Sequence, residues 1–159
     1  MDFGYRKIQT SDEKNIALEL YELFSDQPLA VLSTQGEGQP FSNLIAFVST
    51  EDLKNIIFAT TRSTRKFTNI GKEPRVSFLI DNRSNEVDDF HKAMAVTATG
   101  KAYEIRSEDK VVFLKLYLKK HPHLEDFVMS PTCALIRVDV DSYYITKHFQ
   151  NVLVLNIKK

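Results

Sequence analysis

Seven consecutive residues near the middle of the chain combine hydroxyl groups with positive charge. They read Thr60-Thr61-Arg62-Ser63-Thr64-Arg65-Lys66 and stand between a short apolar strand and a predicted helix over 67–71. The start of a helix carries partial positive charge and normally attracts acidic side chains. Arg65 and Lys66 are therefore misplaced there unless an anion binds. Because free N–H groups, hydroxyls and a guanidinium suit phosphate, the segment predicts a phosphate site; the alternative is a solvated basic surface turn.

The remaining side chains that could do chemistry form weaker patterns. Cys133 is the only cysteine and lies in an apolar run, which predicts a core residue and rules out an intramolecular disulfide. His121 and His123 are close enough in sequence to share a metal, but they follow a predicted helix and have no identifiable third ligand, which favours a surface turn. We therefore predict no metal site, and the sequence leaves any catalytic residue unassigned.

The composition limits the classes of function. Lys plus Arg and Asp plus Glu number 21 each, so the 159 residues are formally neutral; a general nucleic-acid binder usually shows a basic excess. The length predicts one domain over 1–159 with a core that needs no disulfide. No apolar run approaches the roughly 20 residues of a membrane span, and residues 1–9 do not resemble a signal peptide. We expect a cytoplasmic protein with no membrane or nucleic-acid partner.

Apolar patterning and turn residues predict a mainly β protein with flanking helices. The expected helices cover 11–24, 67–71 and 107–120, and the expected strands cover 29–34, 41–49, 56–61, 75–80, 93–105, 132–140, 143–146 and 152–157. Short turns between neighbouring strands favour antiparallel pairing, and the absence of alternating strand–helix units argues against a doubly wound nucleotide fold. Gly100 inside a strand predicts a bulge or a close backbone approach. A small closed or partly closed barrel fits best.

Three segments between about Pro28 and Ile80 resemble the pyridoxamine 5′-phosphate oxidase-like, FMN-binding split-barrel family. They are a hairpin ending in Pro40-Phe41-Ser42-Asn43-Leu44-Ile45, then Ile57-Phe58-Ala59-Thr60-Thr61 with Thr64-Arg65-Lys66, then Glu73-Pro74-Arg75-Val76-Ser77-Phe78. The resemblance implies an antiparallel six-stranded split β-barrel. It also implies a homodimer with the cofactor at the interface, so that part of the pocket comes from the second subunit.

The resemblance also implies a set of FMN-binding residues. The phosphate would be held at the helix start by Thr64, Arg65 and Lys66. The end of the preceding strand, with Ala59, Thr60 and Thr61, would contact the flavin. The second hairpin strand would lie along the isoalloxazine ring with its backbone groups at the polar edge, through Ser42, Asn43, Leu44 and Ile45.

Two departures from the family pattern limit the reaction. Ser42 stands where members that oxidise pyridoxamine phosphate have an arginine, and the chain has no tryptophan for the C-terminal segment that grips the vitamer phosphate. We therefore expect an FMN-dependent, flavin reductase-like oxidoreductase that uses NAD(P)H and a small-molecule substrate. The alternative is a non-catalytic protein that stores or senses flavin or haem, with His148 as a haem ligand. The sequence does not separate the two.

Overall fold

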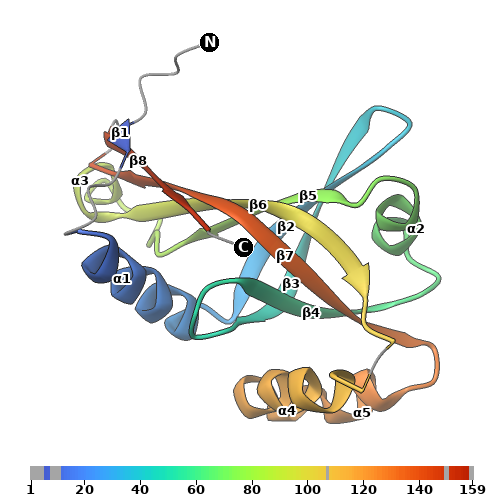
Figure 1. Ribbon diagram of the computed structural model, residues 1–159. Helices are drawn as coiled ribbons and strands as arrows, with labels where there is room; N and C mark the ends of the chain where they lie inside the picture. Colours follow the sequence, from blue (N-terminus) through green and yellow to red (C-terminus); the bar gives the residue numbers. More distant parts are fainter. Residues whose placement is uncertain (1–5, 8–11, 107, 149–150, 158–159) are drawn as a thin grey trace.

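The computed structural model describes residues 6–7, 12–106, 108–148 and 151–157 (Figure 1). The strands are β1 (Arg6–Lys7), β2 (Leu29–Gly36), β3 (Gln39–Ser49), β4 (Asn55–Thr61), β5 (Arg75–Asp81), β6 (Met94–Glu104), β7 (Cys133–Lys147) and β8 (Asn151–Asn156). The helices are α1 (Glu13–Asp26), α2 (Arg65–Lys72), α3 (Asp89–Lys92), α4 (Lys110–Lys120), the 3-10 helix η1 (Pro122–Leu124) and α5 (Glu125–Met129). Ser11 and Ser107, the predicted first residues of two helices, lie outside the described residues.

Six of the strands form a closed antiparallel barrel, which confirms the predicted fold. The order β7-β4-β3-β2-β5-β6 returns to β7 because β6 pairs with both β5 and β7. β8 adds to the free edge of β7, and β1 pairs with β8 in parallel. The two strands predicted over 132–146 are one continuous strand, β7, so that prediction was wrong. Its length lets β7 pair with β4 near its start and with β8 near its end.

The barrel interior and one outer patch make two apolar cores. Alternating residues of the six strands point inward and pack with the apolar side of α1, including Leu20 and Phe24, which are almost fully buried. The second core lies outside the barrel, where α4 and α5 cover β4 and β7 through Ile57, Tyr117 and Leu135. Cys133 belongs to this second core and is buried, as predicted. None of the helices among the described residues is long and apolar enough to cross a membrane.

Gly100 marks the bulge that the sequence predicts. The register between β6 and β7 shifts at Thr99/Gly100, and a Cβ at Gly100 would lie 2.4 Å from the backbone oxygen of Asp139. Only glycine allows the two strands to approach this closely. The extra residue of the bulge is Asp141 on β7, so β7 bends at this point.

His121 is buried, so its prediction as part of a surface turn was wrong. Its Nε2 lies 2.8 Å from the backbone oxygen of Phe47. Continuing the β2–β3 register by one pair places Pro28 opposite Phe47, and proline has no N–H to donate. His121 replaces that missing donor and ties the end of α4 to β3. Burial lowers the pKa of His121, which keeps the ring neutral as the Nε2–H tautomer.

Candidate functional site

β3 and β4 pair over only a short length and then separate. Their ladder consists of Ser49↔Ile56, Val48↔Ile57 and Phe47↔Phe58. Beyond it, the first half of β3 pairs only with β2, and the end of β4 pairs only with β7. The facing edges of the two strands therefore have backbone groups with no strand partner in the described part of the chain. We call this opening the β3–β4 gap.

The three predicted parts of the site meet around the β3–β4 gap. Ser42–Ile45 lie on one edge and Ala59–Thr61 lie on the other, and three residues separate β4 from α2. α2 also touches β3 directly, because the Arg65 guanidinium lies 4.7 Å from the centre of the Phe41 ring. This contact is a cation–π interaction. The ten residues that the resemblance selects thus lie on the two strands that border the gap and at the helix start that follows β4.

Thr64 begins α2 as its N-cap. Its Oγ1 accepts a hydrogen bond from the backbone N–H of Phe67 at 3.4 Å and donates to the backbone oxygen of Thr61 at 2.8 Å. The buried Thr60 hydroxyl lies 2.9 Å from Thr64 Oγ1. Both hydroxyls are therefore engaged in holding the turn. The backbone N–H groups of Arg65 and Lys66, by contrast, have no acceptor in the described structure.

Arg65 and Lys66 have no carboxylate partner among the described residues. Lys66 is half-buried, and desolvation lowers the pKa of its amine. Burying a charge without a counter-ion costs free energy, and the first turn of α2 contains no acidic residue that would offset the cost. Together with the two free N–H groups, these side chains form a cationic site at the positive end of a helix, which suits a phosphate.

Arg62 has a different role from the other two cations. Its Nη2 lies 2.6 Å from Glu104 Oε1, its Nη1 donates to the backbone oxygen of Pro131 at 2.8 Å, and its backbone N–H donates to Thr132. Arg62 is therefore committed within the protein, in agreement with its omission from the predicted anchors.

The β3 edge presents two kinds of side chain. Ser42 and Leu44 point away from the barrel, and Leu44 is 69% exposed. Asn43 and Ile45 alternate with them toward the interior, and Ile45 belongs to the barrel core. The Oδ1 atom of Asn43 is buried and has no hydrogen-bond partner within the described structure. A buried acceptor of this kind costs free energy until a donor reaches it.

The β4 edge is mostly apolar on its outer side. Ala59 belongs to the core under α4 and α5, and Thr61 is half-buried at the end of the strand. The β3–β4 gap can therefore combine an anion site at α2 with hydrogen-bonding backbone edges.

Two polar residues that hold the site in place were missed by sequence reasoning. Asn69 is buried on the inner side of α2 and donates to the Thr34 hydroxyl at 3.1 Å, which fixes the helix on β2. Gly36 permits this packing, since a Cβ there would lie 2.3 Å from Asn69 Oδ1. Glu104 holds Arg62, as described above. The amide of Asn69 on the apolar side of a short helix was a signal that the sequence offered. The sequence offered no such signal for Glu104, because its partner Arg62 is 42 residues away.

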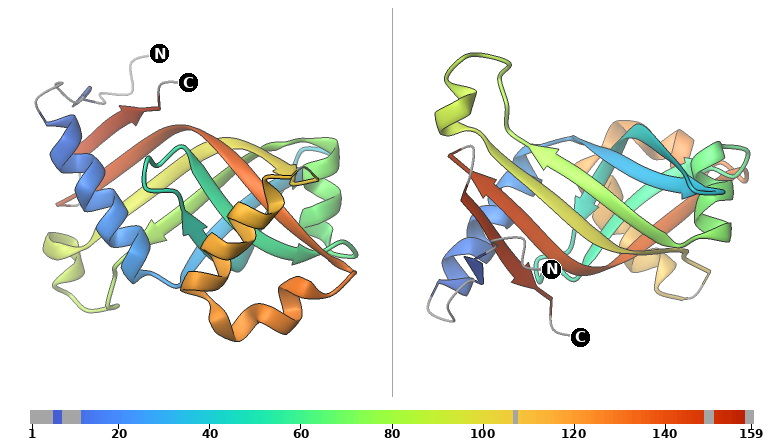
Figure 2. Two further views of the ribbon diagram at one scale, coloured as in Figure 1. Left: turned by 60° about the horizontal axis from the view of Figure 1, so that its bottom comes forward. Right: turned by 90° about the horizontal axis from the view of Figure 1, so that it is seen from above.

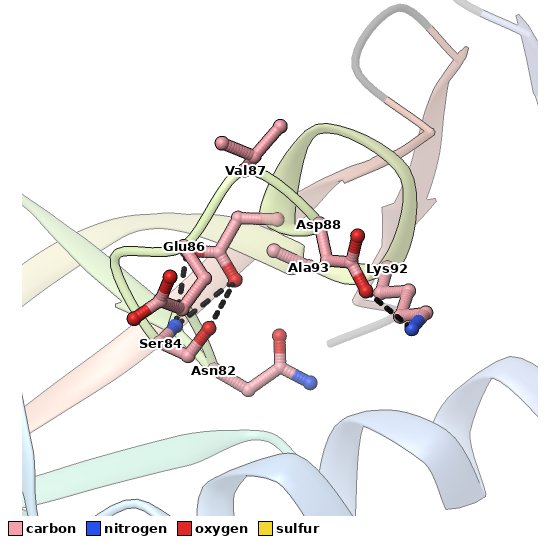
Figure 3. Close-up of a pocket in the computed structure, with 8 residues that line it drawn as sticks. Asn82, Ser84, Glu86, Val87, Asp88, Lys92 and Ala93 are labelled. Carbon is pink, nitrogen blue, oxygen red and sulfur yellow. Dashed lines mark hydrogen bonds and ion pairs between the residues drawn. The ribbon is translucent and has the colours of Figure 1, made fainter.

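A cavity of about 530 Å³ lies away from the β3–β4 gap. It is formed by α3 and the loop before it (Figure 3). Its lining includes Glu86, Asp88 and Asp89, and Asp88 pairs with Lys92. α3 and α2 lie at opposite ends of the barrel (Figures 1 and 2). None of the ten predicted residues lines this cavity, and its carboxylates disfavour an anion.

A closed six-stranded antiparallel barrel with flanking helices is the split-barrel fold. The family model described as pyridoxamine 5′-phosphate oxidase matches residues 17–147. The chain belongs to the pyridoxamine 5′-phosphate oxidase family. No curated protein sequence matches the chain.

Solved structures with the same fold differ widely in sequence. General Stress Protein 26 from Bacillus anthracis is 20% identical with a TM-score of 0.69, covering 90% of this chain and 99% of that one. A FAD-binding protein from Mesorhizobium loti is 14% identical with a TM-score of 0.65, covering 81% and 90%. A heme binding protein from Mycobacterium smegmatis is 15% identical with a TM-score of 0.78, covering 88% of this chain and 57% of the other. At these identities the likeness establishes the fold alone.

Proposed function

We propose that the protein binds FMN in the β3–β4 gap and acts as an FMN-dependent oxidoreductase. The observation that carries the proposal is the half-buried Lys66 beside Arg65 and two backbone N–H groups at the start of α2, none of which has a carboxylate or acceptor partner in the part of the chain that the structure describes. The FMN phosphate would lie against these groups, and the ring would lie along the free edges of Ser42–Ile45 and Ala59–Thr61. The unpartnered Asn43 acceptor suits a ligand that carries an N–H donor.

The protein's contribution to such chemistry is binding and orientation. A bound flavin supplies electron and hydride transfer itself, and the surrounding protein positions it and sets its electrostatics. NAD(P)H is the electron donor that we propose, with a small-molecule acceptor. Despite the family name, we propose that pyridoxamine phosphate is not the substrate. Ser42 cannot pair with the vitamer phosphate as an arginine would, and the chain has no tryptophan.

We further propose that the site is completed by a second copy of the chain. Two adjacent rows of outward side chains cross the barrel without a single charge. The first row consists of Ser42, Ser33, Ser77, Thr99 and Ser142. The second row consists of Leu44, Val31, Leu79, Thr97, Tyr144 and Val154. No helix of the described structure covers this face (Figure 2, right). Interfaces are depleted in charge at their centre, and because Ser42 and Leu44 also border the β3–β4 gap, the partner would lie against the flavin.

The absorption spectrum of the purified protein tests the function. We expect flavin bands in the blue, either at once or after FMN is added, and steady NAD(P)H oxidation that depends on FMN. Tight flavin binding without turnover would favour the non-catalytic alternative. A colourless protein that fails to bind added FMN would contradict the proposal.

Light scattering tests the dimer. Thr97→Arg places a charge in the neutral face and should yield monomers that bind FMN more weakly.

Haem binding is a second candidate, favoured by the geometry of one histidine. His148 is an exposed residue, and its Nδ1 atom lies 2.9 Å from the backbone oxygen of His91. This hydrogen bond leaves Nε2 as the unprotonated nitrogen, the state that binds iron. We expect that a Soret band appearing on haem titration would be lost in His148→Ala. A spectrum unchanged by haem would remove this candidate.

A further inference from the structure

We propose that Glu104 is a positioning residue that makes the β3–β4 gap selective for a phosphorylated flavin. This inference rests on the proposed FMN site. Glu104 does not reach the helix start itself. It acts through Arg62, which belongs to the turn between β4 and α2 and is held by Glu104 Oε1 at 2.6 Å.

Arg62 anchors this turn to two other parts of the chain. Besides Glu104 at the end of β6, it binds the segment before β7 through the backbone oxygens of Pro131 and Thr132. Glu104 is only 13% exposed and is fixed from its other side, because Oε2 accepts from Arg106 at 2.9 Å. Glu104, the two arginines and the segment before β7 are thus joined by hydrogen bonds beside the turn. Two residues after Arg62, Thr64 starts α2 and sets the direction of the free N–H groups.

Glu104 also determines which cations face the ligand. With Arg62 neutralised by the carboxylate, Arg65 and Lys66 are the two cations of the turn that have no carboxylate partner in the described structure. A freed Arg62 would compete for the same space with a flexible side chain. The site is then defined by two cations and two N–H groups in fixed positions, which is the arrangement that a compact phosphate requires.

Removing Glu104 distinguishes positioning from simple electrostatics, because the two predict opposite signs. Loss of a carboxylate near a phosphate should strengthen FMN binding if only charge matters. If Glu104 positions the turn, Glu104→Ala should weaken FMN binding at least fivefold. It should leave the affinity for riboflavin, which lacks the phosphate, within twofold. Both affinities can be measured on the full chain by quenching of flavin fluorescence.

A matched control lies at the other end of the same helix. Glu73 follows α2 and forms a two-pronged ion pair with Arg75 at 2.7 and 2.8 Å. Glu73→Ala removes a similar pair far from the helix start, so its ratio of FMN to riboflavin affinity should stay at the wild-type value. If Glu104→Ala does not fold, Glu104→Gln keeps the shape and one acceptor and should lower the ratio about threefold.

The outcomes separate this inference from the proposed function. Wild-type protein that binds no flavin would overturn the proposed function. Wild-type protein that prefers FMN, with a Glu104 variant that keeps or raises that preference, would overturn the role of Glu104 alone. An equal loss of FMN and riboflavin would also overturn it, because a general structural effect does not discriminate between the two ligands.

Discussion

Replacing Lys66 with methionine should weaken FMN binding without weakening the fold. Lys66 is half-buried, has no carboxylate partner in the described structure, and has a lowered pKa because of desolvation. Methionine keeps the length of the apolar stem and removes the charge. The free protein loses no ion pair, so its free energy of unfolding should stay equal or rise. The phosphate complex loses one charge-assisted contact.

The size of the affinity loss follows from the burial of this side chain. Hydrogen bonds to charged groups contribute about 1.5–3 kcal/mol, and water near a half-buried amine screens part of this. The lower half of the range applies, which corresponds to about a tenfold to fortyfold loss of FMN affinity. Riboflavin should bind the variant and the wild type equally. Added salt should weaken FMN binding to the wild type more than to the variant.

Lys72→Met is the matched control for this prediction. Lys72 is exposed at the opposite end of α2 and pairs with exposed Glu37 at 3.3 Å, an interaction of about 0–1 kcal/mol. FMN affinity should be unchanged in this variant. An unchanged FMN affinity in Lys66→Met, or an equal loss with riboflavin, would refute the assignment of Lys66 as a phosphate anchor.

Three further predictions concern the anion site, the barrel and its pH dependence. Arg65→Ala combined with Lys66→Ala should weaken FMN by several kcal/mol in a fluorescence titration, and unchanged affinity would place the phosphate elsewhere. Gly100→Ala should cost about 1–3 kcal/mol in urea unfolding because its Cβ meets backbone, whereas Gly71→Ala in open space should gain about 0.5–1 kcal/mol; equal effects would contradict the close approach. The native pKa of His121 is lowered, so the unfolded state binds the extra proton first and stability should fall from pH 7 toward pH 5. His121→Gln should flatten that slope; a slope unaltered by His121→Gln would contradict the buried neutral ring.

The fold was largely predictable because its strands have clear apolar patterns and turn residues. The strands predicted over 29–34, 41–49, 56–61 and 75–80 correspond to β2, β3, β4 and β5 within two residues at each end. The division of β7 at 141–142 was wrong: the strand continues through the register shift at Asp141, and Ser142 pairs with Thr99 and Asn156. The short helices α3 and α5 were missed, since five residues or fewer give no helical periodicity.

The site was predictable where local sequence carries the signal and not where tertiary structure decides. Two cations at a helix start, Arg65 and Lys66, are an electrostatic anomaly that can be read without a structure. The β3–β4 gap depends on where a strand ladder ends, and Glu104 and His121 depend on partners far away in the chain. Thr64 was correctly placed at the helix start, but its hydroxyl is engaged in the cap. Its proposed contact with phosphate therefore remains a prediction.

A comparison of FMN and riboflavin binding to the purified wild-type protein tests the central claim most directly. The two ligands share the ring and differ by the phosphate, so their affinity ratio measures the anion site at the start of α2. We predict that FMN binds at least tenfold more tightly than riboflavin in low salt. Equal affinities, or no binding of either flavin, would contradict the account.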